Sequence, residues 1–165
     1  MKELTTLILL FAASILATSQ TTIKNFTDKY KGEKDATVVS IKGNVFNLLG
    51  NIAEWSDDEE AEMVGRIFKG INSMEVLSLS LYDIGISREE INKLKSDLLK
   101  DKYEEYVTVR EGKETINVYA QGTKENISNM LIIIQERDDF SIVNIDGSLS
   151  HKDIAYIVKH HDDWD

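Results

Sequence analysis

The stretch that decides the fold is Phe140-Ser-Ile-Val-Asn-Ile-Asp-Gly147, followed by Ser-Leu-Ser-His-Lys-Asp-Ile-Ala-Tyr-Ile-Val158. Its first part is rich in β-branched residues and is typical of a buried strand. Gly147 predicts a turn that needs a positive φ. After it, Ser150 and Asp153 have the spacing of a capping box, which predicts the start of a helix. The unit is therefore a strand, a glycine turn and a capped helix.

A similar sequence pattern occurs near the start of the chain. It consists of Thr37-Val-Val-Ser-Ile-Lys-Gly43 followed by Asn44-Val-Phe-Asn-Leu-Leu-Gly-Asn-Ile52. When Gly43 is aligned with Gly147, the apolar residues of the two strands coincide. The matched pairs are Val38 with Ile142, Val39 with Val143, and Ile41 with Ile145. The helices that follow drift out of register, so the pattern indicates a weak internal repeat rather than a tandem array.

Length and composition predict a single globular domain. The chain has 165 residues, of which 42% are hydrophobic and 29% charged, and both fractions are ordinary for such a domain. The net charge of −10 argues against nucleic acid and against an anionic membrane surface, because both attract basic proteins. The chain contains no cysteine, which excludes disulfides, thiolate chemistry and cysteine-based metal sites.

The first 19 residues predict export. They combine a lysine near the start, an apolar run, and small residues at Ala17-Thr18-Ser19, which is the pattern of a signal peptide cleaved before Gln20. The apolar run is short for a membrane span, and an uncleaved N-terminal anchor is the alternative. Because the chain has no cysteine to carry a lipid, we expect no lipid anchor. We expect a signal peptide at 1–19, one domain at 20–159 and a polar tail at 160–165.

Periodicity and capping signals place the other elements. Residues 44–55 predict a helix that buries Val45, Leu48, Leu49 and Ile52 on one side, and Ser56 and Ser87 are expected to cap the next two helices. The run 130–134 is apolar throughout and predicts a strand covered on both faces. Further strands are expected at 36–41, 74–82, 103–110, 113–120 and 140–145. The whole predicts an α+β domain with a mostly antiparallel sheet of five or six strands and helices mainly on one face.

Two clusters contain the residue types of a metal site. Ser56-Asp-Asp-Glu-Glu60 lacks the alternating oxygens and glycine of a calcium loop, and we interpret it as the acidic start of a helix. His160-His-Asp-Asp163 has ligand types suited to zinc or copper. Neighbouring residues on a helix point about 100° apart, however, and chain ends fray, so we interpret this cluster as a solvated tail.

No motif specifies catalysis. His151 is expected to be exposed, because it follows a helix cap, and the chain has no G-x-S-x-G nucleophile elbow. Tyr103, Tyr106 and Tyr119 surround the hairpin expected at Glu111-Gly112. They are explained by cross-strand packing or by a recognition patch, and we favour packing.

Several stretches together resemble a known family. They are Tyr103-Glu-Glu-Tyr106, Ile116-Asn-Val-Tyr119, Ile127–Ile134 and Phe140–Gly147, with Phe26-Thr-Asp-Lys-Tyr30 and Phe46-Asn-Leu-Leu49 in the front half. The pattern resembles the family called domain of unknown function 4252, whose members are small exported proteins found chiefly in Bacteroidetes. The resemblance implies export and an α+β domain. It carries no catalytic residue that could be transferred.

The sequence therefore predicts a non-catalytic extracytoplasmic binding or interaction module, secreted or periplasmic, whose partner is a protein or small molecule of the cell envelope. We assign no catalytic, cofactor-binding or metal-ligating residue, and we expect no cofactor and no nucleic-acid partner. The alternative is an exported hydrolase with a site built from scattered carboxylates. Buried carboxylates with raised pKa values in a cleft would favour the hydrolase, and an exposed apolar or aromatic patch would favour the binding module.

Overall fold

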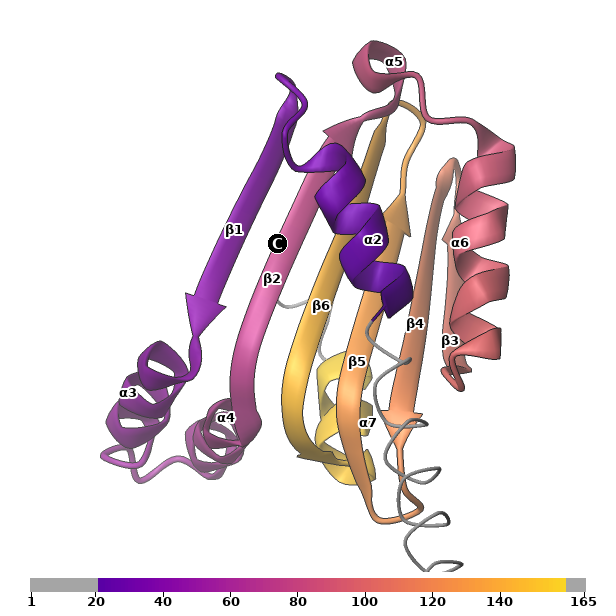
Figure 1. The fold of residues 1–165 in the computed structure, drawn as a ribbon. Helices are drawn as coiled ribbons and strands as arrows, with labels where there is room; N and C mark the ends of the chain where they lie inside the picture. Colours follow the sequence, from indigo (N-terminus) through magenta and orange to yellow (C-terminus); the bar gives the residue numbers. More distant parts are fainter. Residues whose placement is uncertain (1–20, 160–165) are drawn as a thin grey trace, which may run out of the picture.

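The computed structural model describes residues 21–159, which form one α+β domain built on a six-stranded sheet. The strand order is β1-β2-β6-β5-β4-β3, and every neighbouring pair is antiparallel (Figure 1). The α+β class and the mostly antiparallel sheet of five or six strands expected from the sequence are thus confirmed, and the sheet has six strands. The strands are β1 (Ala36–Lys42), β2 (Ile71–Ser80), β3 (Glu104–Glu111), β4 (Glu114–Gly122), β5 (Asn126–Gln135) and β6 (Asp139–Ser150).

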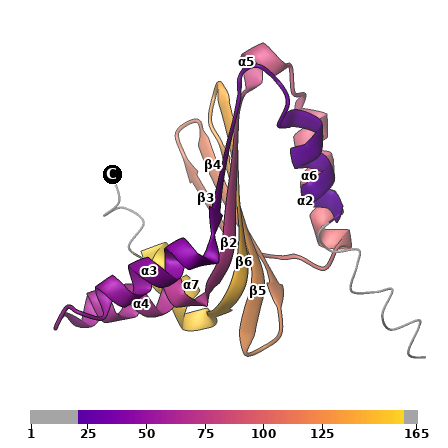
Figure 2. The same ribbon diagram turned by 60° about the vertical axis from the view of Figure 1, so that its left-hand side comes forward.

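The helices lie on both faces of the sheet, whereas we expected them mainly on one. The described helices are α2 (Thr21–Tyr30), α3 (Gly43–Ala53), α4 (Glu59–Gly70), α5 (Leu81–Ile84), α6 (Arg88–Lys100) and α7 (His151–Lys159). Figure 2 shows α2 and α6 on one side, here called the first face, and α3, α4 and α7 on the other, the second face. Helices pack on both faces because the central strands carry apolar side chains on both faces.

Each face has its own apolar core. Along β5, Leu131 and Ile133 belong to the core under α2 and α6, while Met130 belongs to the core beside α3, α4 and α7. This alternation follows from the period of two in a β-strand. The first core also contains Phe26, Leu77, Leu98 and Phe140, and the second also contains Phe46, Ile67, Leu149 and Ile154.

The internal repeat corresponds to a real relation between β1 and β6. Both strands pair antiparallel with β2, one on each side of it, and therefore run parallel to each other. Val38 and Ile142 both lie opposite Leu77, and the other aligned pairs likewise share one partner: Val76 for Val39 and Val143, and Met74 for Ile41 and Ile145. Each strand leads into a helix on the second face, α3 or α7. The repeat therefore marks two strand–helix units related across β2.

The two aligned glycines allow close approach of backbone and do not form positive-φ turns. The predicted turn at Gly147 is wrong, because β6 runs through this residue and pairs it with Ile71. A Cβ atom there would lie 2.2 Å from the carbonyl oxygen of Gly70. At Gly43 it would lie 2.7 Å from the carbonyl oxygen of Asn72. Both glycines therefore make room for the chain where α4 enters β2.

Side-chain caps begin three of the helices. Ser87 accepts a hydrogen bond from the backbone N–H of Glu90 at 3.2 Å, as predicted. Asp153 N–H donates to Ser150 Oγ at 3.2 Å, and Ser150 N–H donates to Asp153 Oδ2 at 2.7 Å, which confirms the capping box. The prediction for Ser56 is wrong, because the cap of α4 is Asp58, whose side chain accepts from Glu60 N–H at 3.0 Å.

We predict that Gly147→Ala lowers the free energy of unfolding by about 1–3 kcal/mol, since the added methyl group must displace packed backbone. Gly32→Ala is the matched control. Nothing lies within 4 Å of a Cβ built at Gly32, so its effect should stay within about 0.5 kcal/mol. Urea unfolding monitored by circular dichroism measures both variants. Equal stabilities for the two would contradict the close approach at Gly147.

Candidate functional site

The tyrosines around the hairpin divide into two that pack and one that is exposed. Tyr103 and Tyr119 are buried in the first core, which confirms packing for these two. Tyr106 is exposed, and its ring stacks on His151 with the ring centroids 6.0 Å apart and an interplanar angle of 11°. His151 is exposed as the first residue of α7, as predicted.

The acidic cluster of residues 57–60 belongs to the cap and first turn of α4. Acidic side chains there are favourable because they face the positive end of the helix dipole. Within residues 21–159, no group of three or more histidine, aspartate or glutamate side chains is arranged to hold a metal ion. The cluster His160–Asp163 lies outside the described residues. No helix in the described range is long and apolar enough to cross a membrane.

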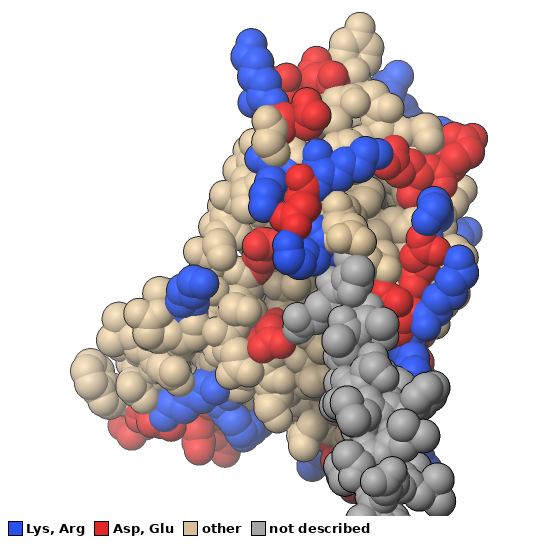
Figure 3. All heavy atoms as spheres, in the orientation of Figure 1, with Lys and Arg blue, Asp and Glu red and all other residues tan. Residues whose placement is uncertain are grey.

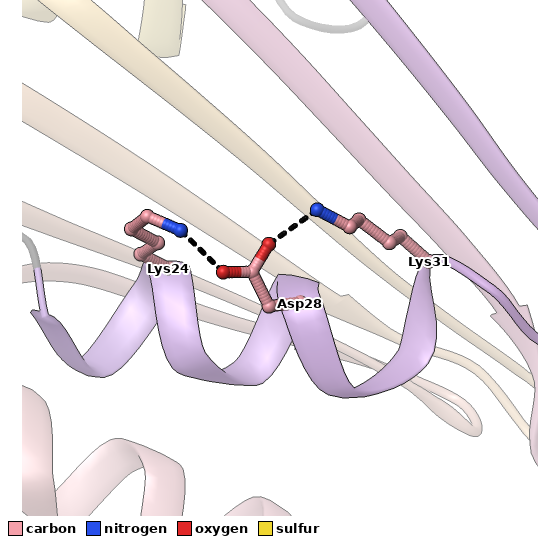
Figure 4. Close-up of polar contacts among 3 residues, drawn as sticks. All are labelled: Lys24, Asp28 and Lys31. Carbon is pink, nitrogen blue, oxygen red and sulfur yellow. Dashed lines mark hydrogen bonds and ion pairs between the residues drawn. The ribbon is translucent and has the colours of Figure 1, made fainter.

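Wherever the structure shifts the pKa of a described carboxyl group, the shift is downward. On α2, hydrogen bonds from Lys24 and Lys31 lower the pKa of Asp28 to about 2 (Figure 4). Hydrogen bonds from a lysine or hydroxyl neighbour also lower the pKa of Glu90, Asp97 and Glu105. A general acid needs the opposite shift. These carboxylates stabilise the surface of the helices and β3, and they give the hydrolase alternative no support.

Helix α3 exposes a continuous apolar side. The prediction that Val45, Leu48, Leu49 and Ile52 are buried is wrong, because each of them is between 40% and 59% exposed. Trp55, two residues beyond the helix, is 83% exposed. The helix itself, Gly-Asn-Val-Phe-Asn-Leu-Leu-Gly-Asn-Ile-Ala, carries no charge.

The apolar side of α3 is exposed because the helix packs mainly through two other residues. Phe46 enters the second core, and Gly50 lies against α4. A Cβ on Gly50 would lie 2.8 Å from the carbonyl oxygen of Gly65, so the two helices approach closely through small residues. Figure 2 shows the α3–α4 pair projecting away from the sheet. A helix held in this way covers little of the sheet with its long apolar side chains.

The second face of the sheet also has an uncovered apolar part. Residues paired across the sheet form one row of β-branched side chains: Val39, Val76, Val143, Ile132, Val118 and Val107. Val39 is exposed, and Val76, Val143 and Ile132 are only partly buried. The prediction that strand 130–134 is covered on both faces is therefore wrong at Ile132. In Figure 2, α3, α4 and α7 gather at one end of this face and leave the end near α5 without a helix.

We use the term open apolar surface for the exposed side of α3 together with Trp55 and the uncovered part of the sheet. Its residues are Val45, Leu48, Leu49 and Ile52 of α3, Trp55, and Val39, Val76, Val143 and Ile132 of the sheet. Among the described residues, the uncovered part of the sheet is apolar on the second face only. On the first face, the sheet end not covered by α2 and α6 carries the polar residues Glu75, Asn144 and Asp146, each of them partly buried. Figure 3 shows uncharged side chains over α3, with charged groups gathered below them along α4.

The fold and this surface define a class of protein: a single α+β domain whose antiparallel sheet keeps part of one apolar face open. The chain belongs to the family described as "Domain of unknown function (DUF4252)", whose family model matches residues 30–157. The family resemblance inferred from the sequence is thus confirmed. Searches of curated proteins and of solved structures gave no match.

We predict that truncation of two residues of α3 lowers the stability by very different amounts. Phe46→Ala should lower the free energy of unfolding by about 3–5 kcal/mol, because it leaves a cavity in the second core. Leu48→Ala should lower it by less than about 1 kcal/mol, because Leu48 is 59% exposed. Denaturant unfolding of both variants measures the difference. A large loss for Leu48→Ala would show that its side chain is covered in the free protein.

We predict a loss of stability in alkali. Burial raises the pKa of Tyr103 and of Tyr119 to about 12, from an ordinary value of 10.0. Because the folded pKa is higher, the stabilisation is complete below pH 10.0 and is lost as pH rises through about 12. Phenolate absorbance against pH measures the ionisation. Tyr119→Phe should remove one late-titrating group, and an unchanged late phase in this variant would contradict the assignment.

Proposed function

We propose that this chain is a non-catalytic, exported interaction module that docks onto another protein of the cell envelope through its open apolar surface. The observation that carries the proposal is α3, an uncharged helix with one apolar side turned to solvent. Large contiguous apolar patches are uncommon on soluble proteins and mark places where another molecule binds.

The composition of the surface suits a protein interface. Aliphatic side chains at Leu48, Leu49 and Ile52 offer area whose removal from water contributes about 25 cal/mol per Å². Trp55 stands at the edge of this area with most of its ring in water. Tryptophan is the residue type most enriched among those that dominate binding energy. We therefore assign Trp55 as the anchor of the interface.

The charges around the surface indicate what kind of protein binds. The acidic residues Asp57–Glu60 begin two positions after Trp55, and the whole chain carries a net charge of −10. A partner with an apolar centre and a basic rim complements this arrangement and associates faster because of it. A lipid surface is the poorer match. Helices that lie on membranes carry lysine and arginine on their polar side, whereas the polar positions of α3 are asparagines.

Export rests on the signal-peptide pattern of residues 1–19. It places the module outside the cytoplasm, either secreted or periplasmic. Mass spectrometry of the protein recovered from cells measures the mature N-terminus. A chain that begins at or near Gln20 agrees with export and cleavage, and a chain that retains residues 1–19 contradicts cleavage.

Site-specific photo-crosslinking in cells tests the interaction. A photoreactive phenylalanine at Leu48 or at Ile132 should give one shared higher-mass adduct, because both positions lie in the open apolar surface. The matched control is Tyr82 on α5, an aromatic residue that is 88% exposed and lies outside the surface. It should give no adduct of that mass.

The mass and identity of the adduct decide the outcome. Another envelope protein at positions 48 and 132 supports the proposal, and Trp55→Ala should then reduce the yield at least several-fold. An adduct of twice the chain mass would instead assign the surface to self-association. Equal adducts at 48 and 82, or none at 48, would overturn the proposal.

A further inference from the structure

A pocket of about 480 Å³ opens at the sheet end where β3 begins and β4 ends. Its walls include Lys102 from the α6–β3 turn, Glu104 and Tyr106 from the start of β3, Lys124 from the β4–β5 connection, and His151 from α7. This volume lies within the range of about 300–1,000 Å³ typical of small-molecule sites. None of these five residues belongs to the open apolar surface.

Basic side chains gather in this pocket although the protein is acidic. Lys102, Lys124 and His151 come from three separate segments of the chain, and Glu104 is the acidic residue that lines the pocket with them. Among the described residues, six other lysines form ion pairs with carboxylates, but neither Lys102 nor Lys124 does so. The two lysines that line the pocket thus have no carboxylate partner among residues 21–159.

The stacked rings of Tyr106 and His151 form part of the pocket wall. Stacking at an interplanar angle of 11° holds the imidazole parallel to the phenol ring. An N–H group at the edge of the imidazole ring can donate a hydrogen bond to a ligand. His151 is also the first residue of α7, so backbone N–H groups of the first helical turn are near.

The backbone at Lys102 gives an independent indication. The end of α6 is a Schellman motif, in which Tyr103 N–H donates to Leu98 O at 3.0 Å and Lys102 N–H donates to Leu99 O at 3.2 Å. The motif places Lys102 in the left-handed region with φ 66, and it is the only non-glycine residue with positive φ among residues 21–159. Glycine is the usual residue at this position because a Cβ is disfavoured there. A lysine in this position makes the protein less stable than a glycine would, and the side chain of Lys102 lines the pocket.

We propose that this pocket binds a small organic anion through its carboxylate or phosphate group, held by the ammonium groups of Lys102 and Lys124 beside the imidazole of His151. Charge-assisted hydrogen bonds to such a group are the strong kind, since both partners are ionised. The lysine at the glycine position is explained by this role, because functional sites often retain residues that cost stability. Binding here is independent of docking through the open apolar surface.

The test is a nuclear magnetic resonance titration of the ¹⁵N-labelled protein at low salt. Citrate and inorganic phosphate are added separately, so that a carboxylate ligand is distinguished from a phosphate ligand. We expect saturable shifts of the backbone amides of residues 102, 106, 124 and 151 with at least one of the two probes. Lys102→Gly should weaken that binding at least tenfold and also raise the thermal unfolding midpoint.

Two control variants separate a specific site from general charge. Lys113→Gln removes an exposed lysine from the β3–β4 turn, outside the pocket, and should leave both affinity and midpoint unchanged. Lys124→Gln should weaken binding without raising the midpoint. Absence of saturable shifts with both probes, or equal weakening by Lys113→Gln and Lys102→Gly, would overturn the proposal. So would a Lys102→Gly variant that unfolds more readily while it binds as tightly as the wild-type protein.

Discussion

The packing of β6 between β2 and β5 is the constraint on which the other features depend. This strand pairs with a neighbour on both edges and carries apolar side chains on both faces, with Phe140 and Ile142 in the first core and Ile145 in the second. A sheet that is apolar on both faces needs a covering layer on each of them. The helices achieve this only in part: α2 and α6 cover one end of the first face, and α3, α4 and α7 cover the opposite end of the second. The first face is polar where it lacks a helix, whereas the second is apolar there, which is why an apolar surface remains exposed on the second face.

The two candidate sites have different physical origins. The open apolar surface exists because close glycine packing between α3 and α4 turns the long aliphatic side chains of α3 away from the sheet. The anion pocket exists because the ends of α6, β4 and β6 meet at one end of the sheet and bring Lys102, Lys124 and His151 together. Apolar area supplies most of the free energy in the first case, and paired charges with a defined geometry supply the specificity in the second. The two proposed sites share no residue, so binding at one would not compete directly with binding at the other.

The sequence predicted features that are determined locally. The caps at Ser87 and Ser150 follow from residues near one another in the chain, and the relation between β1 and β6 follows from two short segments with the same apolar pattern. The burial of Leu48 was predicted wrongly, because helical periodicity shows which side is apolar and not whether anything covers it. Gly147 was misinterpreted, because a glycine needed for close approach and one needed for positive φ look alike in a single sequence. The pocket escaped prediction because its residues are distant in the chain, although the lack of a glycine after α6 was a usable signal.

The central claim is that part of the apolar second face of the sheet is open to solvent in the free protein, whereas the apolar part of the first face is covered. Solvent relaxation of methyl resonances by a soluble gadolinium chelate measures this directly, because each methyl group is broadened according to its access to water. Along β5 we predict strong broadening of Ile132, which is partly exposed, and little broadening of Leu131 and Ile133, which are fully buried. The methyl resonances of Val143 should be broadened as strongly as those of Ile132. Those of Ile142 should be broadened as little as those of Leu131 and Ile133. Equal protection of Ile132 and Ile133 would mean that the second face is already covered, and the claim of an open apolar surface would be wrong.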